Sequence, residues 1–233
     1  MTYNQSYKKL VEQVLITGTW VESRNSQTLS IPFYSFIIKD LANDHKLLLR
    51  KQGVKGIEGE FKTLMSKTPL VNSAQFRANS CNYWEANAGP NGELRLDYYD
   101  ELHAQLPNLV ANIKSDPYSR RHKLELWNHK NVSSGVLSLP CCWTGFTISI
   151  LENKLHMTFN TRSQDLMLGT QADVYIAWLF MKYLSEETGY ATGDLMYTMS
   201  NVHLYEEHIP GAKELLTRTE SDFDKKLSFE LKA

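Results

Sequence analysis

This chain of 233 residues lacks most of the features that assign a sequence to a broad class at first reading. It has no run of about 18 apolar residues, so we expect no membrane-spanning helix. Residues 1–10 are polar and contain no apolar core of a secretion signal. The 25 Lys and Arg nearly balance the 26 Asp and Glu, and a net charge of -1 gives no indication of a nucleic-acid or membrane partner. These absences predict a soluble cytoplasmic protein.

Cysteine is also scarce, with only Cys81, Cys141 and Cys142. An odd, small number in a chain of this size argues against a disulfide framework. No Cys-x-x-Cys pair occurs, and the seven His have no zinc-like spacing, so we expect no bound metal. The cysteines are therefore expected to be reduced.

The sequence contains no Pro-, Gly- or Ser-rich linker and no block of like charge, so we expect a single domain over residues 1–233. Apolar residues at helical spacing predict helices over residues 3–15, 56–64, 101–114 and 171–188, the last ended by Gly189. Strands are predicted over residues 28–38, 122–127, 146–151, 155–160, 195–204 and 226–231, with a tight connection at 152–154 and a turn at 89–92. Residues 20–27 are polar and indicate a loop. Strands and helices mix without a regular repeat, which predicts an α+β fold with a large mixed β-sheet packed with helices.

The segment Leu139-Pro140-Cys141-Cys142-Trp143 offers a candidate nucleophile in Cys142. A cysteine is usually a small buried hydrophobe, so position alone does not indicate reactivity. A thiolate needs a nearby cation or hydrogen-bond donors, and Arg162 would supply the cation if the two strands are neighbours.

Each of the other polar residues has both a structural and a functional interpretation. Arg120 and Arg121 are either a solvated pair or a phosphate site, because planar bidentate donors suit oxyanions. Asp173, near the start of a helix, either favours the helix dipole or accepts hydrogen bonds from an amidine-like edge such as that of cytosine. His203 and Tyr205 share a strand face, as a half-buried polar pair or as donors to a sugar hydroxyl.

Taken together in their order, these residues resemble the thymidylate synthase superfamily. The resemblance from Cys142 to Tyr205 needs no gap when Cys142, rather than Cys141, is the nucleophile. It extends upstream through residues 115–121 and Trp127-Asn128. Further matches are Arg24, Glu60, Trp84 and Tyr98.

The resemblance implies a homodimer joined through its sheet faces, in which each subunit lends two arginines to the other. The nucleotide phosphate would be gripped by Arg24, Arg162, Ser163 and the partner's Arg120 and Arg121. Cys142 would add to carbon 6 of the pyrimidine, so that carbon 5 attacks the one-carbon unit of 5,10-methylenetetrahydrofolate. Glu60 would manage protons and ordered water, His203 and Tyr205 would hold the ribose 3'-hydroxyl, and the folate would contact Trp84, Tyr98 and Asp165.

Two departures from the synthase pattern indicate which pyrimidine base the protein uses. Synthases have an Asn at the position of Asp173, whereas an Asp there is the pattern of the deoxycytidylate hydroxymethylases. An ionised Asp only accepts hydrogen bonds, so it would repel the carbonyl at carbon 4 of uracil but accept from a cytosine amine. A buried polar group left unpaired against the wrong base costs about 1–3 kcal/mol. Trp143 replaces the His that follows the nucleophile in synthases, which also favours a base other than uracil.

The sequence stops after residues 229–233, without the long synthase tail that closes over the folate. An open, wetter site would let water, instead of a hydride, attack the methylene intermediate and yield a hydroxymethyl product.

The leading hypothesis is therefore a phage-type deoxycytidylate (dCMP) 5-hydroxymethyltransferase that modifies DNA precursors, with dCMP and folate as its partners. The enzyme alternatives are a dCMP methylase and a divergent dUMP methylase or hydroxymethylase, and a ribonucleotide substrate stays open. The alternative outside enzymology is an inactive nucleotide-binding or RNA-binding homologue.

Overall fold

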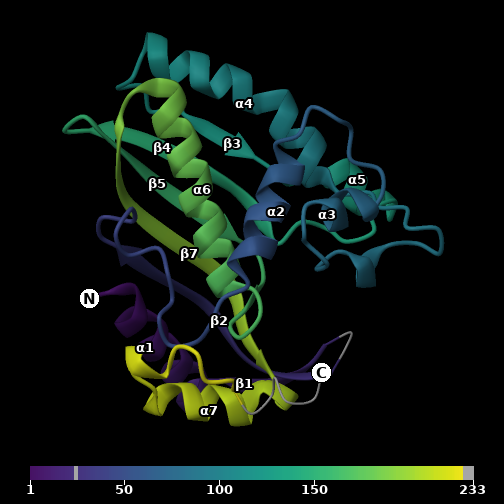
Figure 1. Cartoon of the computed structure of the whole chain (residues 1–233), viewed down its shortest axis with the longest axis vertical. Helices are drawn as coiled ribbons and strands as arrows, with labels where there is room; N and C mark the ends of the chain where they lie inside the picture. The colour runs from purple at the N-terminus through teal and green to yellow at the C-terminus, as the bar shows by residue number, and fades with distance from the viewer. Residues whose placement is uncertain (24–25, 228–233) are drawn as a thin grey trace.

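The computed structural model describes residues 1–23 and 26–227, and one mixed β-sheet organises them (Figure 1). Its seven strands run in the order β1-β2-β7-β5-β4-β3, with β6 paired to β7. The strands are β1 (Thr19–Glu22), β2 (Gln27–Ile38), β3 (Lys123–Glu125), β4 (Trp143–Leu151), β5 (Lys154–Thr161), β6 (Gln164–Asp165) and β7 (Ala191–Tyr205). β7 is parallel to β5 and β6, and the other pairs are antiparallel, so the predicted α+β fold with a large mixed sheet is confirmed.

Helices cover one face of this sheet. Figure 1 shows α6 lying across β4, β5 and β7 with α2 and α4 beside it, while α1 and α7 lie at the other end. The α-helices are α1 (Tyr3–Thr17), α2 (Val54–Leu64), α3 (Ala74–Ala78), α4 (Asp97–Ser115), α5 (His129–Ser134), α6 (Thr170–Thr188) and α7 (Ile209–Thr217). Short 3-10 turns occur at η1 (Glu85–Asn87), η2 (Glu206–His208) and η3 (Glu220–Asp222). None of the helices within the described residues is long and apolar enough to cross a membrane.

The alternation along β2 explains why only one face is covered. Phe36 and Ile38 are buried against α1, whereas Phe33 and Ile37 point the other way and stay exposed. Successive side chains of a strand face opposite sides, so this pattern separates a packed face from an open one. Burying one such aromatic or aliphatic side chain contributes about 1.5–3 kcal/mol, so the packed face supplies most of the stability.

The β4–β5 hairpin fixes the geometry around the candidate nucleophile. Glu152 and Asn153 have positive φ values of 49° and 57°, which close a two-residue connection between paired Leu151 and Lys154. At the other end of the hairpin, the register shifts between Trp143 and Gly145. Gly145 has a φ of 144°, and a Cβ there would lie 2.1 Å from the carbonyl oxygen of Leu124 on β3. Only glycine fits this bulge, and the bulge sets the direction of the chain at Trp143 and the residues before it.

Most predicted elements are present, with bounds that differ by a few residues, and Gly189 ends α6 in the left-handed conformation as predicted. The loop predicted over residues 20–27 is wrong in its first part, because Thr19–Glu22 forms the edge strand β1. Every residue of β1 is exposed, so no buried alternation marks it, and it is held by backbone pairing with β2 and by a hydrogen bond from the Thr28 hydroxyl to the carbonyl oxygen of Val21. The strand predicted over residues 226–231 lies mostly outside the described residues, and its first two residues are not in a strand.

Candidate active site

The two adjacent cysteines occupy different environments just before β4. Cys141 is buried, and its thiol donates to the carbonyl oxygen of Leu126 at 3.4 Å. Cys142 is only partly buried and packs at the edge of the core. Of the two thiols, that of Cys142 is therefore the one open to a small molecule.

The backbone around Cys142 is held from both sides. The hydroxyl of Tyr98 on α4 accepts hydrogen bonds from the backbone N–H groups of Cys142 at 2.5 Å and Trp143 at 3.3 Å. From β5, the backbone N–H of Arg162 donates to the carbonyl oxygen of Cys142 at 2.9 Å. The Arg162 side chain adds bonds to the carbonyl oxygens of Cys141, at 2.8 Å, and Pro140, at 2.9 Å. The two strands are thus neighbours, and Arg162 lies beside Cys142.

The guanidinium of Arg162 also stacks over the ring of Trp127, 5.4 Å from its centroid. Its Nη1 atom donates to no residue among those the structure describes, which leaves one edge of the guanidinium open to an anion. A stacked, half-anchored guanidinium of this kind is suited to binding phosphate.

Burial raises the pKa of the Cys142 thiol, and the neighbouring carboxylate of Asp173 adds to the rise. Arg162 lowers the pKa, as the sequence suggested, but does not outweigh these effects, and Asp165 adds a smaller rise. In the protein without ligands, the neutral thiol is therefore the dominant form at pH 7. Any reaction through this sulfur needs its proton removed as the ligand binds.

Asp173 lies in the first turn of α6 with its carboxylate directed at β4 and β7. Its Oδ1 accepts from the indole Nε1 of Trp143 at 2.7 Å, and its Oδ2 accepts from Nε2 of Gln164 at 2.8 Å. The hydroxyl of Tyr197 lies 3.4 Å from the same Oδ2. Burial raises the pKa of Asp173 to about 6 although these three donors lower it. The carboxyl therefore changes its charge close to neutral pH.

Glu60 on α2 is a second buried carboxyl near the same centre. Its Oε1 accepts from the indole Nε1 of Trp84 at 2.9 Å. Burial raises the pKa of Glu60 to about 8, and the nearby charge of Asp173 adds to the rise. At pH 7 Glu60 is mostly neutral and can donate a proton.

Comparison with family models identifies the protein family in which this arrangement of two carboxyls and a thiol occurs. The family model described as thymidylate synthase matches residues 5–232. The chain belongs to the thymidylate synthase family. Its family chemistry is folate-dependent one-carbon transfer to a pyrimidine nucleotide, with methylenetetrahydrofolate as the one-carbon donor.

His203 and Tyr205, which are expected to hold the ribose in this thymidylate synthase family member, lie next to each other and close to Asp165. β6 pairs with β7 so that Asp165 is opposite His203, whose ring lies 5.4 Å from that of Tyr205. Ser163 is half-buried in the turn between β5 and β6, next to Arg162. Arg24 lies outside the described residues.

Arg120 and Arg121 are not brought to Cys142 within one chain. They are exposed in the turn before β3, and the carbonyl oxygen of the adjacent His122 accepts from the backbone N–H of Ile148, far along β4. At about 3.3 Å per residue, this point is about 20 Å along the strand from Cys142. In a single subunit the two arginines therefore cannot contact a phosphate held at Arg162.

Of the three residues predicted to contact the folate, Trp84 and Tyr98 are buried and Asp165 is half-buried. The rings of Trp84 and Tyr98, 8% and 3% exposed, pack edge to face at 5.9 Å inside the wall of the site. Asp165 is half-buried, and its Oδ1 accepts from the backbone N–H groups of Met167 and Leu168. Its Oδ2 has no partner among the described residues, so this oxygen is available to a ligand.

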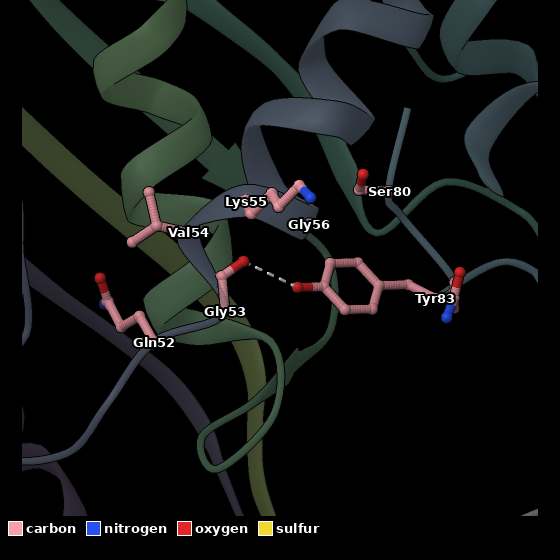
Figure 2. Close-up of a pocket in the computed structure, with 8 residues that line it drawn as sticks. Gln52, Gly53, Val54, Lys55, Gly56, Ser80 and Tyr83 are labelled. Carbon is pink, nitrogen blue, oxygen red and sulfur yellow. Dashed lines mark hydrogen bonds between the residues drawn. The ribbon is translucent and has the colours of Figure 1, made fainter. Parts of the chain in front are cut away.

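Figure 2 shows a surface hollow of about 400 Å³ beside the site. It lies at the start of α2, where the Tyr83 ring points at Gly53 and its hydroxyl donates to that carbonyl oxygen at 3.2 Å. Lys55 is the one charged side chain that lines it. The hollow contains none of the residues predicted for the site, although Glu60 lies on the same helix. Within the described ranges, no three His, Cys, Asp or Glu side chains form a metal site.

Sequence reasoning missed Gln164 and Tyr197, which both contact Asp173. Gln164 occupies the variable position within the Arg162-Ser163-x-Asp165 motif, and Tyr197 lies inside a predicted strand. Both side chains are almost wholly buried. A polar residue at a buried strand position was the available signal, because such groups need partners.

Proposed function

We propose that this chain is a deoxycytidylate 5-hydroxymethyltransferase. The reaction joins dCMP, 5,10-methylenetetrahydrofolate and water to give 5-hydroxymethyl-dCMP and tetrahydrofolate. The observation on which the choice of base rests is the carboxylate of Asp173, which is half-buried near Cys142 and accepts hydrogen bonds from three donors. The hydroxymethyl outcome rests on the resemblance to the hydroxymethylases that share this Asp.

The chemistry of Asp173 suits cytosine better than uracil. Cytosine presents an amine at carbon 4, which donates, and its N3 becomes an N–H once a nucleophile has added to carbon 6. The ionised carboxylate of Asp173 accepts from the amine, and it accepts from N3 as well once Glu60 has supplied N3 with a proton during this addition. Uracil presents a carbonyl oxygen at carbon 4, which repels the ionised form.

Cys142 is the proposed nucleophile. Its thiol would first lose its proton to solvent, and the thiolate sulfur would then form a bond to carbon 6 while electron density moves toward carbon 5. Carbon 5 would attack the one-carbon unit and then lose its hydrogen as a proton. Supporting features are its partial exposure, the backbone bonds from Tyr98 and Arg162, and the burial of the alternative thiol of Cys141. The open edge of Arg162 would hold the phosphate, with Ser163 beside it.

Glu60 is the proposed proton donor on the opposite wall. Its pKa of about 8 keeps it protonated at pH 7, and the bond from Trp84 fixes its orientation. A neutral carboxyl at this position can give a proton to an atom of the substrate or to an ordered water.

The residues present also fit a folate, which supplies the one-carbon unit at the methylene level when bound. The free Oδ2 of Asp165 can accept from the N–H groups of a pterin ring. The hollow in Figure 2 offers an aromatic ring in Tyr83 and a cation in Lys55, a suitable pair for the benzoyl-glutamate part. Trp84 and Tyr98 are buried, so they would not contact the folate directly but would shape the surface against which it binds.

We also propose that the protein is a homodimer in which each subunit supplies arginines to the phosphate site of the other. The uncovered sheet face exposes Phe33, Ile37 and Met196, of which the last two are paired across β2 and β7. Exposed apolar side chains grouped on one face favour a protein interface. Dimerisation through this face would let Arg120 and Arg121 reach the partner's phosphate.

The function is tested by release of tritium from carbon 5 of labelled dCMP in the presence of the folate. Wild type should release tritium, and Cys142→Ser should release none, because serine is a far weaker nucleophile. Mixing Cys142→Ser with Arg121→Ala should restore about one quarter of the activity through mixed dimers that contain one complete site. If wild type releases tritium from labelled dUMP but not from dCMP, the dUMP enzyme replaces this proposal, and if it releases tritium from neither nucleotide, the binding protein does.

A further inference from the structure

A line of buried hydrogen bonds ends on Asp173 and includes two residues with no assigned role. The hydroxyl of Tyr197 donates to Oε1 of Gln164 at 2.7 Å, and Nε2 of the same Gln164 donates to Oδ2 of Asp173 at 2.8 Å. Gln164 is 1% exposed and Tyr197 is fully buried. The two inner members of the line are therefore shielded from water, whereas Asp173 at its end is half-buried.

The chemistry of the groups fixes the direction of this line. An ionised carboxylate only accepts hydrogen bonds, so Gln164 must turn its nitrogen toward Asp173 and its oxygen toward Tyr197. The single hydrogen of the Tyr197 hydroxyl is shared between the shorter bond, to Gln164 at 2.7 Å, and a weaker one, to Asp173 at 3.4 Å. Every donor points toward the carboxylate.

The proposed function underlies the next step. We propose that Gln164 and Tyr197 are positioning residues that fix the orientation of the Asp173 carboxylate, favour its ionised form, and thereby determine the preference for cytosine. Packing alone does not require the two polar groups. The Tyr197 ring lies between Phe36, at 5.6 Å, and Phe159, at 5.7 Å, where a phenylalanine would fit equally well.

The surroundings of Asp173 otherwise oppose its charge. Burial and the carboxylate of Asp165 raise its pKa, and the hydrogen bonds from Gln164, Trp143 and Tyr197 lower it. Further titratable groups that interact with Asp173 are Tyr3 on α1, Glu60 on α2, Tyr98 on α4, Cys142 before β4 and Tyr197 on β7, none of them cationic. The cations in this region are Arg50, which bonds to Gln171, and Arg162, which bonds to the carbonyl oxygens of Cys141 and Pro140. Loss of the line should therefore shift Asp173 toward its protonated form.

This shift has a consequence for the base. A protonated carboxyl carries an O–H donor and a carbonyl acceptor, so it can pair with the uracil edge as an Asn would. Without the line, the carboxyl is also free to rotate toward either edge. The preference for dCMP over dUMP should then fall by about tenfold, the usual effect of one hydrogen bond to a charged group. The pKa of Asp173 should rise by about one unit.

Tyr197→Phe is the sharpest variant, since it removes one oxygen and keeps the ring. Gln164→Met keeps the length of the side chain and removes both polar atoms. Tyr175→Phe is the matched control, because it removes a hydroxyl bonded to Glu58 at 3.0 Å on the same helix as Asp173. The structure gives the control no contact with the line.

Two measurements on the folded dimer test the proposal. Calorimetry gives the dissociation constants of dCMP and dUMP without folate, and carbon-13 NMR of labelled aspartate gives the pKa of Asp173, from about pH 5 to about pH 9. We expect Tyr197→Phe and Gln164→Met to lower the dCMP preference and raise the pKa, with Tyr175→Phe like wild type. An unchanged ratio and an unchanged titration in Tyr197→Phe would overturn the proposal.

The two measurements also separate this proposal from the proposed function. If wild type binds dCMP no better than dUMP, the cytosine assignment fails. The titration of Asp173 in Tyr197→Phe still decides whether the line controls its charge, because that measurement needs no nucleotide.

Discussion

The two sides of this active site are built from different kinds of structure. On the pyrimidine side, Cys142, Arg162 and Asp173 come from the ends of β4 and β5 and the start of α6. On the folate side, Trp84 and Tyr98 come from a loop and the beginning of α4, and both are buried in the wall. In paired strands with a fixed register, the spacing of residues in the sequence determines which of them lie side by side, whereas in loops it does not. The residues proposed to read the base therefore lie where strands and a helix meet, and those expected at the folate are buried in the wall behind them.

This difference suggests a division of labour that substitutions can break. Changes on the pyrimidine side should alter which base is used. Changes on the folate side should alter proton handling and leave the choice of base intact. The three predictions below follow from this division, in order of expected effect.

The largest effect is expected for Asp173→Asn. An amide offers both a donor and an acceptor, so it pairs with uracil and leaves a mismatch with cytosine. We expect the ratio of kcat/KM for dCMP over dUMP to fall by about 100-fold, the upper range for a mismatched buried polar group. Steady-state kinetics with each nucleotide measures this ratio. A variant that keeps the wild-type preference would show that base choice lies elsewhere in the site.

Glu60 should set the upper break in the pH profile. The Cys142 thiolate increases as pH rises toward its raised pKa, while neutral Glu60 decreases above a pKa of about 8. For wild type, kcat/KM should therefore rise by about tenfold per pH unit at lower pH and flatten near pH 8. Glu60→Gln cannot titrate, so its profile, at lower activity, should keep rising beyond that point. The base preference of this variant should equal that of wild type; a change would break the division between the two sides.

The smallest effect is expected for Cys141→Ala. Its thiol is buried against the carbonyl oxygen of Leu126 and does not face the site. Activity should stay within about twofold of wild type, with a loss of stability of about 1 kcal/mol for the lost packing and weak hydrogen bond. Thermal unfolding and tritium release measure the two quantities. Loss of tritium release in Cys141→Ala with retention in Cys142→Ser would exchange the roles of the two cysteines.

The closeness of Arg162 to Cys142, which the sequence made conditional on neighbouring strands, has a local structural cause. The tight Glu152-Asn153 connection sets the register of β4 and β5, and that register brings Arg162 to Cys142. The helical pattern of residues 171–188 likewise predicted that Asp173 begins a helix. Each of these depends on local rules of turns and periodicity.

The remaining contacts depend on tertiary packing, which one sequence does not encode in a readable pattern. Trp143 reaches Asp173 only because α6 packs across β4, and Gln164 reaches Tyr197 only because β6 adds to β7. Tyr98 lies behind the nucleophile because α4 packs at that end of the sheet. These partners are 30 or more residues apart in the chain, so no spacing rule predicts them.

The central claim is that Asp173 directs this thymidylate synthase family member to cytosine and that water completes the product. The most direct measurement is the mass of the product formed by wild type from an equal mixture of dCMP and dUMP with methylenetetrahydrofolate, with dihydrofolate followed by absorbance. The account predicts 5-hydroxymethyl-dCMP as the main product, with no dihydrofolate formed. A product made mainly from dUMP would contradict the role of Asp173, and a methylated product with dihydrofolate would contradict the role of water.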